Sequence, residues 1–277
     1  MSMSQVLHCR PVGLTAAGWL ALHATALWPH GLWALRRLTD GSDDPLGVAA
    51  AAALALWLAL AAPTLRLQPR IGWLCLAAAL TAAATAAWWL APPLPAAMLA
   101  VLALAAHIAA WLPNGVARAP IAGLALLALP LLSSLQFYLG YPLRVFTAAF
   151  SAGLLQAFGQ AAERSGAAMT VNGQLVIVDA PCSGVQMAWL GYFAACSVAA
   201  FGGSSDASFL RRLPFVGLLV LTGNVLRNSL LVGLEARPQG LANAWHETMG
   251  LALLVLVIGA TVCVMSGRAR AGAGAGA

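Results

Sequence analysis

The sequence predicts an all-α, polytopic membrane protein, a helical bundle of about eight or nine transmembrane helices with one short β-hairpin. Of the 277 residues, 61% are hydrophobic and only 8% are charged, and the mean hydropathy is +0.85. The apolar runs are each close to the ~20 residues that cross a bilayer, and short turns with Pro, Gly or Arg separate them. We therefore expect a single integral membrane domain over residues 1–277, without a soluble second domain.

The charge and the cysteines exclude two classes of function. The net charge of +6 comes from 14 basic residues, all of them arginine. Most lie at the ends of apolar segments, which is typical of membrane orientation and gives no support to nucleic-acid binding. The five cysteines form no CxxC pair. Cys182 and Cys196 would lie about 21 Å apart on one helix, too far for a disulfide, so a disulfide-relay enzyme is not expected.

The apolar segments follow one another along the whole chain. We expect them at about 12–35, 46–63, 71–91, 94–112, 119–138, 143–162, 182–202, 213–235 and 243–265. The first four are rich in Ala and Leu, and small residues there favour close helix packing. Their isolated histidines, His23, His30 and His107, favour interfacial or internally hydrogen-bonded side chains over a site. Pro142 is expected to open the sixth segment, because its fixed φ suits a helix start.

A β-hairpin is predicted directly before the seventh segment. Residues 168–171 and 174–178 read as two short strands, and Asn172-Gly173 between them is the preferred pair for a type I′ turn. A hairpin cannot expose its backbone to lipid, so it must lie in the interface or be covered by protein. Its second strand leads into Cys182, and we expect the hairpin to form one wall of a site there.

Arginines outside the last segments predict the orientation. Arg211 and Arg212 precede the eighth segment, and Arg268 and Arg270 follow the ninth. The positive-inside rule puts these arginines in the cytoplasm. The hairpin and the beginnings of the seventh and ninth segments then face the extracytoplasmic side of a bacterial inner membrane. The N-terminal arginines do not decide between eight spans and nine.

Three side chains are predicted to lie at one depth near that outer face. Cys182 begins a helix, where unpaired N–H groups and the helix dipole favour a thiolate. Arg227 lies about 21 Å along the eighth segment from Leu213, and a charge inside a span costs at least ~2.5 kcal/mol, so it is rarely left without a partner. His246 lies in the first turn of the last segment. Asn224, one turn before Arg227, can hydrogen-bond or orient it.

Each of these residues also has a structural interpretation. Cys182 could be a small buried apolar residue, and His246 could pair with the neighbouring Glu247. Arg227 could snorkel, or pair with Glu235 or Glu247. All three structural interpretations would have to coincide at one depth, so we favour a site with Cys182 as nucleophile.

The order of these motifs resembles the exosortase/archaeosortase family of membrane cysteine transpeptidases. The resemblance rests on Cys182-Ser183-Gly184, Asn224-x-x-Arg227-Asn228, His246, Pro142-Leu143-Arg144 and the hairpin before Cys182. It covers about residues 119–265, whereas 1–118 match only as variable hydrophobic spans and 266–277 are expected to form a flexible cytoplasmic tail. The resemblance implies that Cys182 is the nucleophile, Arg227 the oxyanion or carbonyl stabiliser and His246 the general acid/base. Supporting roles are predicted for nearby residues, namely Asn224, Arg144, Ser183 and Gly184.

These observations lead to a functional hypothesis. The protein is expected to cleave a C-terminal sorting signal on exported proteins through a thioester on Cys182, without a metal or organic cofactor. The resemblance implies substrates with a Pro-Glu-Pro-like motif, one span and a basic tail, and an unidentified acceptor nucleophile. A transporter usually needs several polar groups along a path, and the first five segments have almost none. A non-catalytic assembly subunit would tolerate the loss of Cys182.

Overall fold

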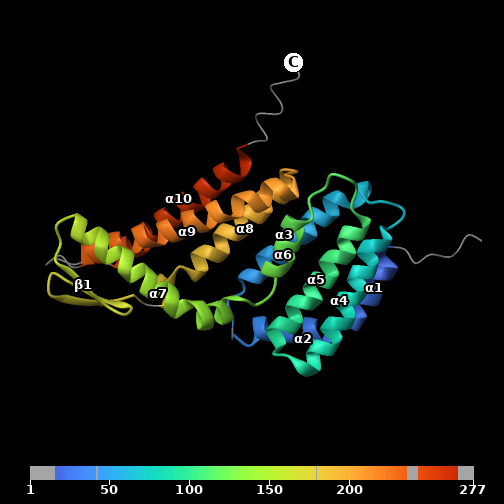
Figure 1. The fold of residues 1–277 in the computed structure, drawn as a ribbon, viewed down its shortest axis with the longest axis horizontal. Helices are drawn as coiled ribbons and strands as arrows, with labels where there is room; N and C mark the ends of the chain where they lie inside the picture. Colours follow the sequence, from blue (N-terminus) through green and yellow to red (C-terminus); the bar gives the residue numbers. More distant parts are fainter. Residues whose placement is uncertain (1–15, 42, 179, 236–242, 268–277) are drawn as a thin grey trace, which may run out of the picture. The chain divides into compact units, whose positions relative to one another are not determined.

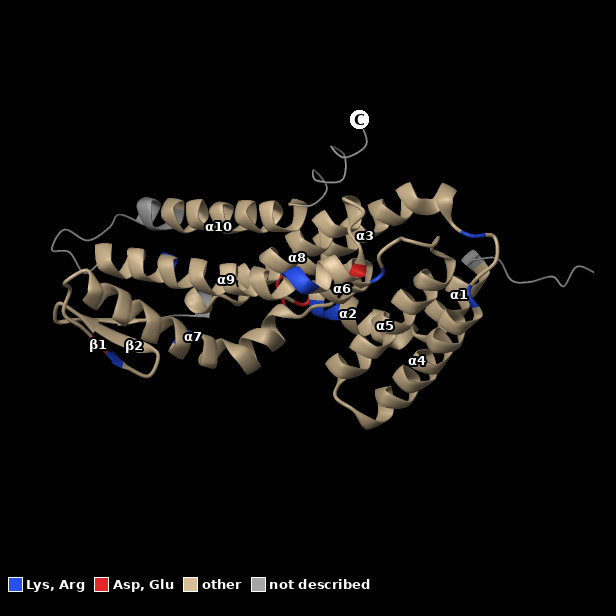
Figure 2. Ribbon diagram, turned by 45° about the horizontal axis from the view of Figure 1, so that its top comes forward, with Lys and Arg blue, Asp and Glu red and all other residues tan. Residues whose placement is uncertain are grey.

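A computed structural model describes residues 16–41, 43–178, 180–235 and 243–267 of the chain, and its contacts divide the chain into two compact units (Figure 1). The first unit contains residues 1–31 and 66–112, and the second contains 32–65 and 113–277. Helices dominate both, as the sequence predicts. In Figure 2 charged residues are few along α10, which agrees with its long apolar sequence.

The first unit is built on small side chains. Its helices are α1 (Ala16–Ala26), α4 (Ile71–Leu90) and α5 (Pro93–Trp111). Ala77 and Ala84 of α4 and Ala103 of α5 are fully buried, and small residues of this kind let two helix backbones approach closely. His23 Nδ1 lies 2.8 Å from Thr81 Oγ1, and the His23 ring packs 5.1 Å from the His107 ring. The interpretation of His23 as an internally hydrogen-bonded residue is confirmed.

The second unit contains the longest helices and a small sheet. Its helices are α3 (Leu46–Ala61), α6 (Ala119–Leu127), α7 (Leu132–Ala157), α8 (Val185–Phe201), α9 (Asp206–Glu235) and α10 (Asn243–Ser266), with the 3-10 turns η1 (Ala62–Thr64) and η2 (Ala180–Ser183). Helix α2 (Trp28–Thr39) begins in the first unit and ends in the second. The predicted last segment, 243–265, is confirmed in α10.

The number of spans differs from the prediction. Among the described residues, five helices are long and apolar enough to cross a membrane: α3 with η1, α4, α5, α9 and α10. The pair of α6 and α7, bent by 95°, counts as a sixth if it is one broken span, and α8 is a shorter apolar helix. Eight or nine spans are therefore not confirmed, although the chain is a multi-pass membrane protein by these helices.

Three prolines lie where the observed helix boundaries differ from the predicted ones. Pro142 does not open a helix but lies inside α7, so the predicted segments 119–138 and 143–162 are wrong at that boundary. Membrane helices tolerate an interior Pro better than soluble ones, because neighbouring groups and local adjustments satisfy the freed carbonyl. The predicted first segment, 12–35, is likewise divided at Leu27, just before Pro29 in the first turn of α2. Similarly, α9 begins at Asp206 rather than 213 and contains Pro214.

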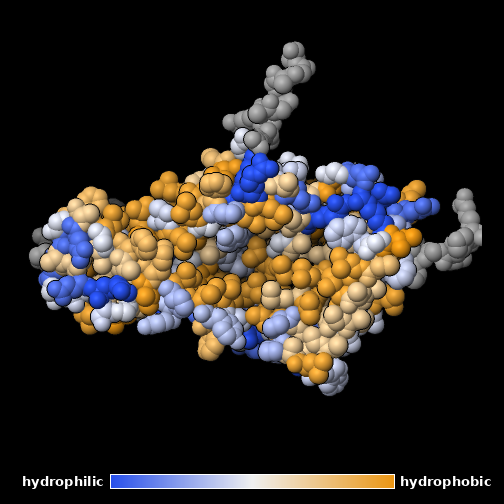
Figure 3. Space-filling model, viewed as in Figure 1, coloured by the Kyte–Doolittle hydropathy of each residue, from blue (hydrophilic) through white to orange (hydrophobic). Residues whose placement is uncertain are grey.

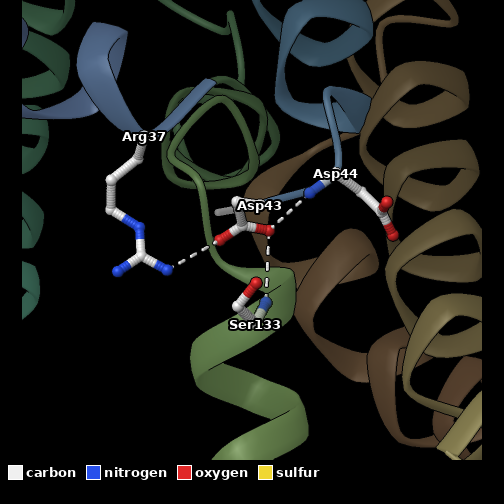
Figure 4. A network of polar contacts seen from close by, with 4 residues as sticks. All are labelled: Arg37, Asp43, Asp44 and Ser133. Carbon is white, nitrogen blue, oxygen red and sulfur yellow. Dashed lines mark hydrogen bonds and ion pairs between the residues drawn. The ribbon is translucent and has the colours of Figure 1, made fainter. Parts of the chain in front are cut away.

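Two aspartates fix the bent pair from outside it. Asp43 lies between α2 and α3, and its Oδ1 accepts hydrogen bonds from the backbone N–H of Asp44 at 2.9 Å and of Ser133 at 3.2 Å (Figure 4). Its Oδ2 pairs with Arg37 at 3.5 Å. Ser133 is in the first turn of α7, where donors lack partners within the helix, so Asp43 caps α7. Asp206 caps α6 in the same way, through the N–H groups of residues 118 and 119 at 2.7 Å.

The predicted hairpin is confirmed and is part of a three-stranded antiparallel sheet. The strands are β1 (Ala162–Ser165), β2 (Ala168–Val171) and β3 (Gln174–Ile177), in the order β1-β2-β3. Asn172 and Gly173 both have positive φ, at 51° and 83°, as a type I′ turn requires. Figure 3 shows hydrophilic surface gathered at this sheet and mainly hydrophobic surface along the neighbouring helices, which suits a sheet in the membrane interface.

Candidate active site

Cys182 lies in a tight turn before α8 and not in its first helical turn. Residues Ala180–Ser183 form the 3-10 turn η2, and α8 begins at Val185 after Gly184, whose φ is +88°. The predicted start of the seventh helix at 182 is therefore wrong. The left-handed conformation of Gly184 breaks the helix there, since residues with a side chain rarely adopt it. Cys182 thus lies just outside the positive end of α8, and the argument from a first-turn position does not apply to it.

The sheet and α7 form one side of the Cys182 turn. Cys182 is partly buried and packs against a cluster of buried apolar side chains, called the sheet cluster below. The cluster comprises Ala148, Ala152 and Leu155 of α7, Ala162, Met169 and Val171 of the sheet, and Val178 and Val232. The hairpin therefore supports the turn that carries the predicted nucleophile, which agrees with its expected place as a wall.

Ser183 and Gly184 hold the shape of this turn. Ser183 is buried, its Oγ donates to Gln136 Oε1 of α7 at 2.9 Å, and it accepts from the Val185 N–H at 3.3 Å. A methyl group added at Gly184 would come within 2.8 Å of Asn224 Cγ. The contacts of Ser183 and Gly184 both fix the backbone next to Cys182. They are compatible with the supporting roles predicted for these two residues.

Asn224 contacts the Cys182 turn. Its Nδ2 donates to the carbonyl oxygen of Cys182 at 3.0 Å and to Thr147 Oγ1 of α7 at 3.0 Å. Its Oδ1 accepts no hydrogen bond from the described residues. Because Arg227 could bind Asn224 only through that oxygen, the expected hydrogen bond between Asn224 and Arg227 is absent from the described part of the chain.

Arg227 lines a cavity between three helices. The cavity has a volume of about 270 Å³ and is lined by Gln186, Met187 and Leu190 of α8, Arg227 of α9, and Gly250, Leu251 and Leu254 of α10. The guanidinium lies against Gly250, where an added methyl group would be 3.1 Å from Arg227 Nε and 3.3 Å from Nη2. A cation is thus placed in a largely apolar cavity, where its field is screened less than in water.

The comparison with family models decides the family. The sequence matches the model of the transmembrane exosortases (Exosortase_EpsH) over residues 9–263. The chain belongs to the transmembrane exosortase family. Comparisons with curated proteins and with solved structures gave no match. The exosortase match also includes the N-terminal spans, which the sequence motifs alone did not connect to the family. Membership of this family indicates a membrane-embedded processing enzyme.

The third predicted catalytic residue of this exosortase is only partly described. The backbone at His246 belongs to the first turn of α10, one helical turn before Gly250, but its side chain lies outside the described residues. The side chains of Glu235 and Glu247, the alternative partners of Arg227, lie outside them as well. The geometry of an imidazole near Cys182 therefore stays a prediction.

Arg144 and Arg164 are directed to other groups. Arg144 Nε donates to the Gly140 carbonyl of its own helix at 3.3 Å, and its guanidinium lies 5.9 Å from the Tyr141 ring centroid. It is not among the residues that line the Arg227 cavity, which come from α8, α9 and α10. Arg164 is exposed on β1, where it donates to the Gly166 carbonyl. Both contacts suit charged side chains in the membrane interface, and neither shows the supporting role predicted for Arg144.

Four further residues contact the candidate site residues or line the Arg227 cavity, and they were not predicted from the sequence. Gln186 is an exposed polar residue, the second residue of α8, and it lines the Arg227 cavity. A polar side chain near the start of an apolar helix was a signal that could have identified it. Gly250, Thr147 and Gln136 carry no such local signal, because their roles depend on contacts with other helices.

Proposed function

We propose that this exosortase is a cysteine protease and transpeptidase that cleaves C-terminal sorting signals of exported proteins. The observation that carries the proposal is the hydrogen bond from Asn224 of α9 to the backbone carbonyl of Cys182. Asn224 is one helical turn from Arg227, which lines a cavity between α8, α9 and α10. A nucleophile and a cation for a developing oxyanion then belong to one site.

The proposed reaction begins with the Cys182 thiol. His246 takes its proton, and the sulfur attacks the carbonyl carbon of the scissile peptide bond. The resulting oxyanion is stabilised by Arg227. The intermediate collapses by breaking the C–N bond, and the leaving amine, which carries the membrane anchor of the substrate, takes the proton from His246. The substrate is left as a thioester on Cys182.

A second nucleophile completes the cycle. An amine, a hydroxyl group or water gives its proton to His246 and attacks the thioester carbonyl. As the C–S bond breaks, His246 returns the proton to the sulfur, which restores the thiol. The chemistry is complete without a metal or organic cofactor. Transfer to an amine or hydroxyl makes the enzyme a transpeptidase, and transfer to water makes it a hydrolase.

The orientation belongs to the same proposal. Arg212 donates to the Met265 carbonyl at the end of α10, so the start of α9 and the end of α10 lie together. This contact supports a common cytoplasmic side for the arginines near both points, with the site at the opposite, extracytoplasmic face of the inner membrane. A substrate would present its motif there, with one span and a basic cytoplasmic tail.

A reporter pair tests the proposed function. One exported reporter ends in a Pro-Glu-Pro-like motif, a single span and an arginine cluster, and its partner has the motif residues scrambled. We expect co-expression with this chain to release only the first reporter from its anchor, as measured by the masses of both products. Absence of cleavage of both reporters, or equal cleavage of both, would contradict the proposal.

A further inference from the structure

Asn224 is buried and contacts both the Cys182 turn and α7. Its side chain is 2% exposed, and both of its hydrogen bonds go to residues that do not line the cavity of Arg227, one to the Cys182 carbonyl and one to Thr147 Oγ1. A backbone carbonyl can only accept, so the amide must present Nδ2 to Cys182, which fixes its orientation. The amide of α9 therefore joins the Cys182 turn to α7 as well as to α9.

Gly184 fits this amide from the other side. Its φ of +88° is available to glycine without strain, and a side chain there would collide with Asn224 Cγ at 2.8 Å. The left-handed residue and the buried amide are thus complementary. The Cys182 carbonyl receives its hydrogen bond from the amide of Asn224, and that amide has room only where residue 184 lacks a side chain.

We infer that Asn224 is a positioning residue, which fixes the backbone of Cys182 on α9 one helical turn from Arg227. The inference rests on the proposed function, in which Cys182 attacks and Arg227 binds the oxyanion. Asn224 and Arg227 are three residues apart on one helix, about 4.5 Å in rise. The amide thereby sets the distance between nucleophile and oxyanion group without touching the substrate.

The chain contains a matched control for this inference. Asn228, one turn further along α9, is 4% exposed, and its Nδ2 donates to Ser151 Oγ of α7 at 3.0 Å. Ser151 lies one turn after Thr147, so the two pairs are equivalent contacts between α7 and α9. The Asn228 pair joins the helices, whereas the Asn224 pair also holds the turn. Loss of either amide removes a similar contact between α7 and α9, but only loss of the Asn224 amide also releases the Cys182 turn.

The test compares Asn224→Leu with Asn228→Leu in the full chain. Misplacement by about 1 Å can cost on the order of 10²-fold in rate. We expect Asn224→Leu to lower kcat for the reporter by roughly 10- to 10²-fold with little change in KM, and Asn228→Leu to change both only slightly. Equal kcat values for the two variants would overturn the inference.

A second readout does not depend on cleavage. Alkylation of Cys182 by iodoacetamide, followed by mass spectrometry of its peptide at a pH where the thiol is ionised, reports exposure of the sulfur. Because Cys182 is partly buried against the sheet cluster, Asn224→Leu should speed its alkylation several-fold and Asn228→Leu should not. Equal alkylation rates would overturn the inference even if the proposed function stands. If the reporter is not cleaved at all, the proposed function fails and this comparison still decides the positioning.

Thr147 supplies the milder variants if Asn224→Leu does not fold. Thr147→Val removes the hydroxyl that holds the amide, and Thr147→Ser keeps it. We expect a partial loss of kcat in the first and near-normal kcat in the second. Near-normal kcat in Thr147→Val together with a loss of kcat in Thr147→Ser would indicate that packing of the methyl group, and not the hydrogen bond, matters, and would count against the inference.

Discussion

Replacement of Cys182 with alanine is expected to abolish cleavage of the sorting-signal reporter while the protein still inserts and folds. The change removes the sulfur that attacks the substrate, and loss of a nucleophile of this kind lowers kcat by roughly 10⁴-fold or more. The fold should tolerate it, because the hydrogen bond of Asn224 goes to the carbonyl of residue 182, which alanine keeps. The measurement is the fraction of reporter released, at matched amounts of membrane-inserted protein.

The control for this variant is another thiol of the same chain. Cys263 is exposed on α10, away from the residues that line the Arg227 cavity, and Cys263→Ala should process the reporter normally. Continued cleavage by Cys182→Ala would remove the thiol mechanism and favour a non-catalytic role for the chain in the membrane.

Replacement of Arg227 with lysine is expected to lower kcat on the order of 10²-fold, with a much smaller change in KM. That is the size seen when one oxyanion donor is removed. Lysine keeps the charge, so a residue that only snorkels or balances a carboxylate would lose little by the change. If the planar guanidinium binds the oxyanion with two or more N–H donors, the lysine ammonium group cannot reproduce that arrangement of donors. The interaction is strongest in the transition state, so the loss should fall on kcat.

The control for Arg227→Lys is an arginine with a structural contact. Arg212 donates to a helix-terminal carbonyl, that of Met265, and a lysine amine can replace it there as a point charge, so Arg212→Lys should cleave almost normally. Near-normal cleavage by Arg227→Lys would show that Arg227 is a structural charge and would leave Cys182 without its proposed oxyanion partner.

Local sequence signals predicted the hairpin of β2 and β3, but they did not predict β1, the third strand of the sheet. Asn172-Gly173 carries its turn conformation in its own residue types, and both φ values are positive as expected. Strand β1, with the sequence Ala-Glu-Arg-Ser, has no β-branched residue and forms by pairing with β2. Such a strand depends on its partner, because β-propensity mainly reflects neighbouring side chains.

The start of α8 could not be predicted from local sequence either, because it depends on a contact with another helix. Cys182-Ser183-Gly184 reads as the start of an apolar helix, but the left-handed Gly184 delays α8 to Val185. The reason lies on α9, where Asn224 fills the space that a side chain at 184 would need. Residue types could identify Cys182 and Arg227 as unusual in apolar segments, whereas the contacts of Asn224 and Gly250 exist only between helices.

The proposed reaction requires Cys182 to carry part of the substrate as a thioester. To test this, the motif reporter is mixed with excess purified enzyme, the reaction is stopped with acid, and the mass of the Cys182 peptide is determined. We expect this peptide to gain the mass of the substrate segment on the amino-terminal side of the cut, and hydroxylamine to remove that mass. Cleavage without a substrate adduct on Cys182, or with the adduct on another residue, would contradict the thioester mechanism.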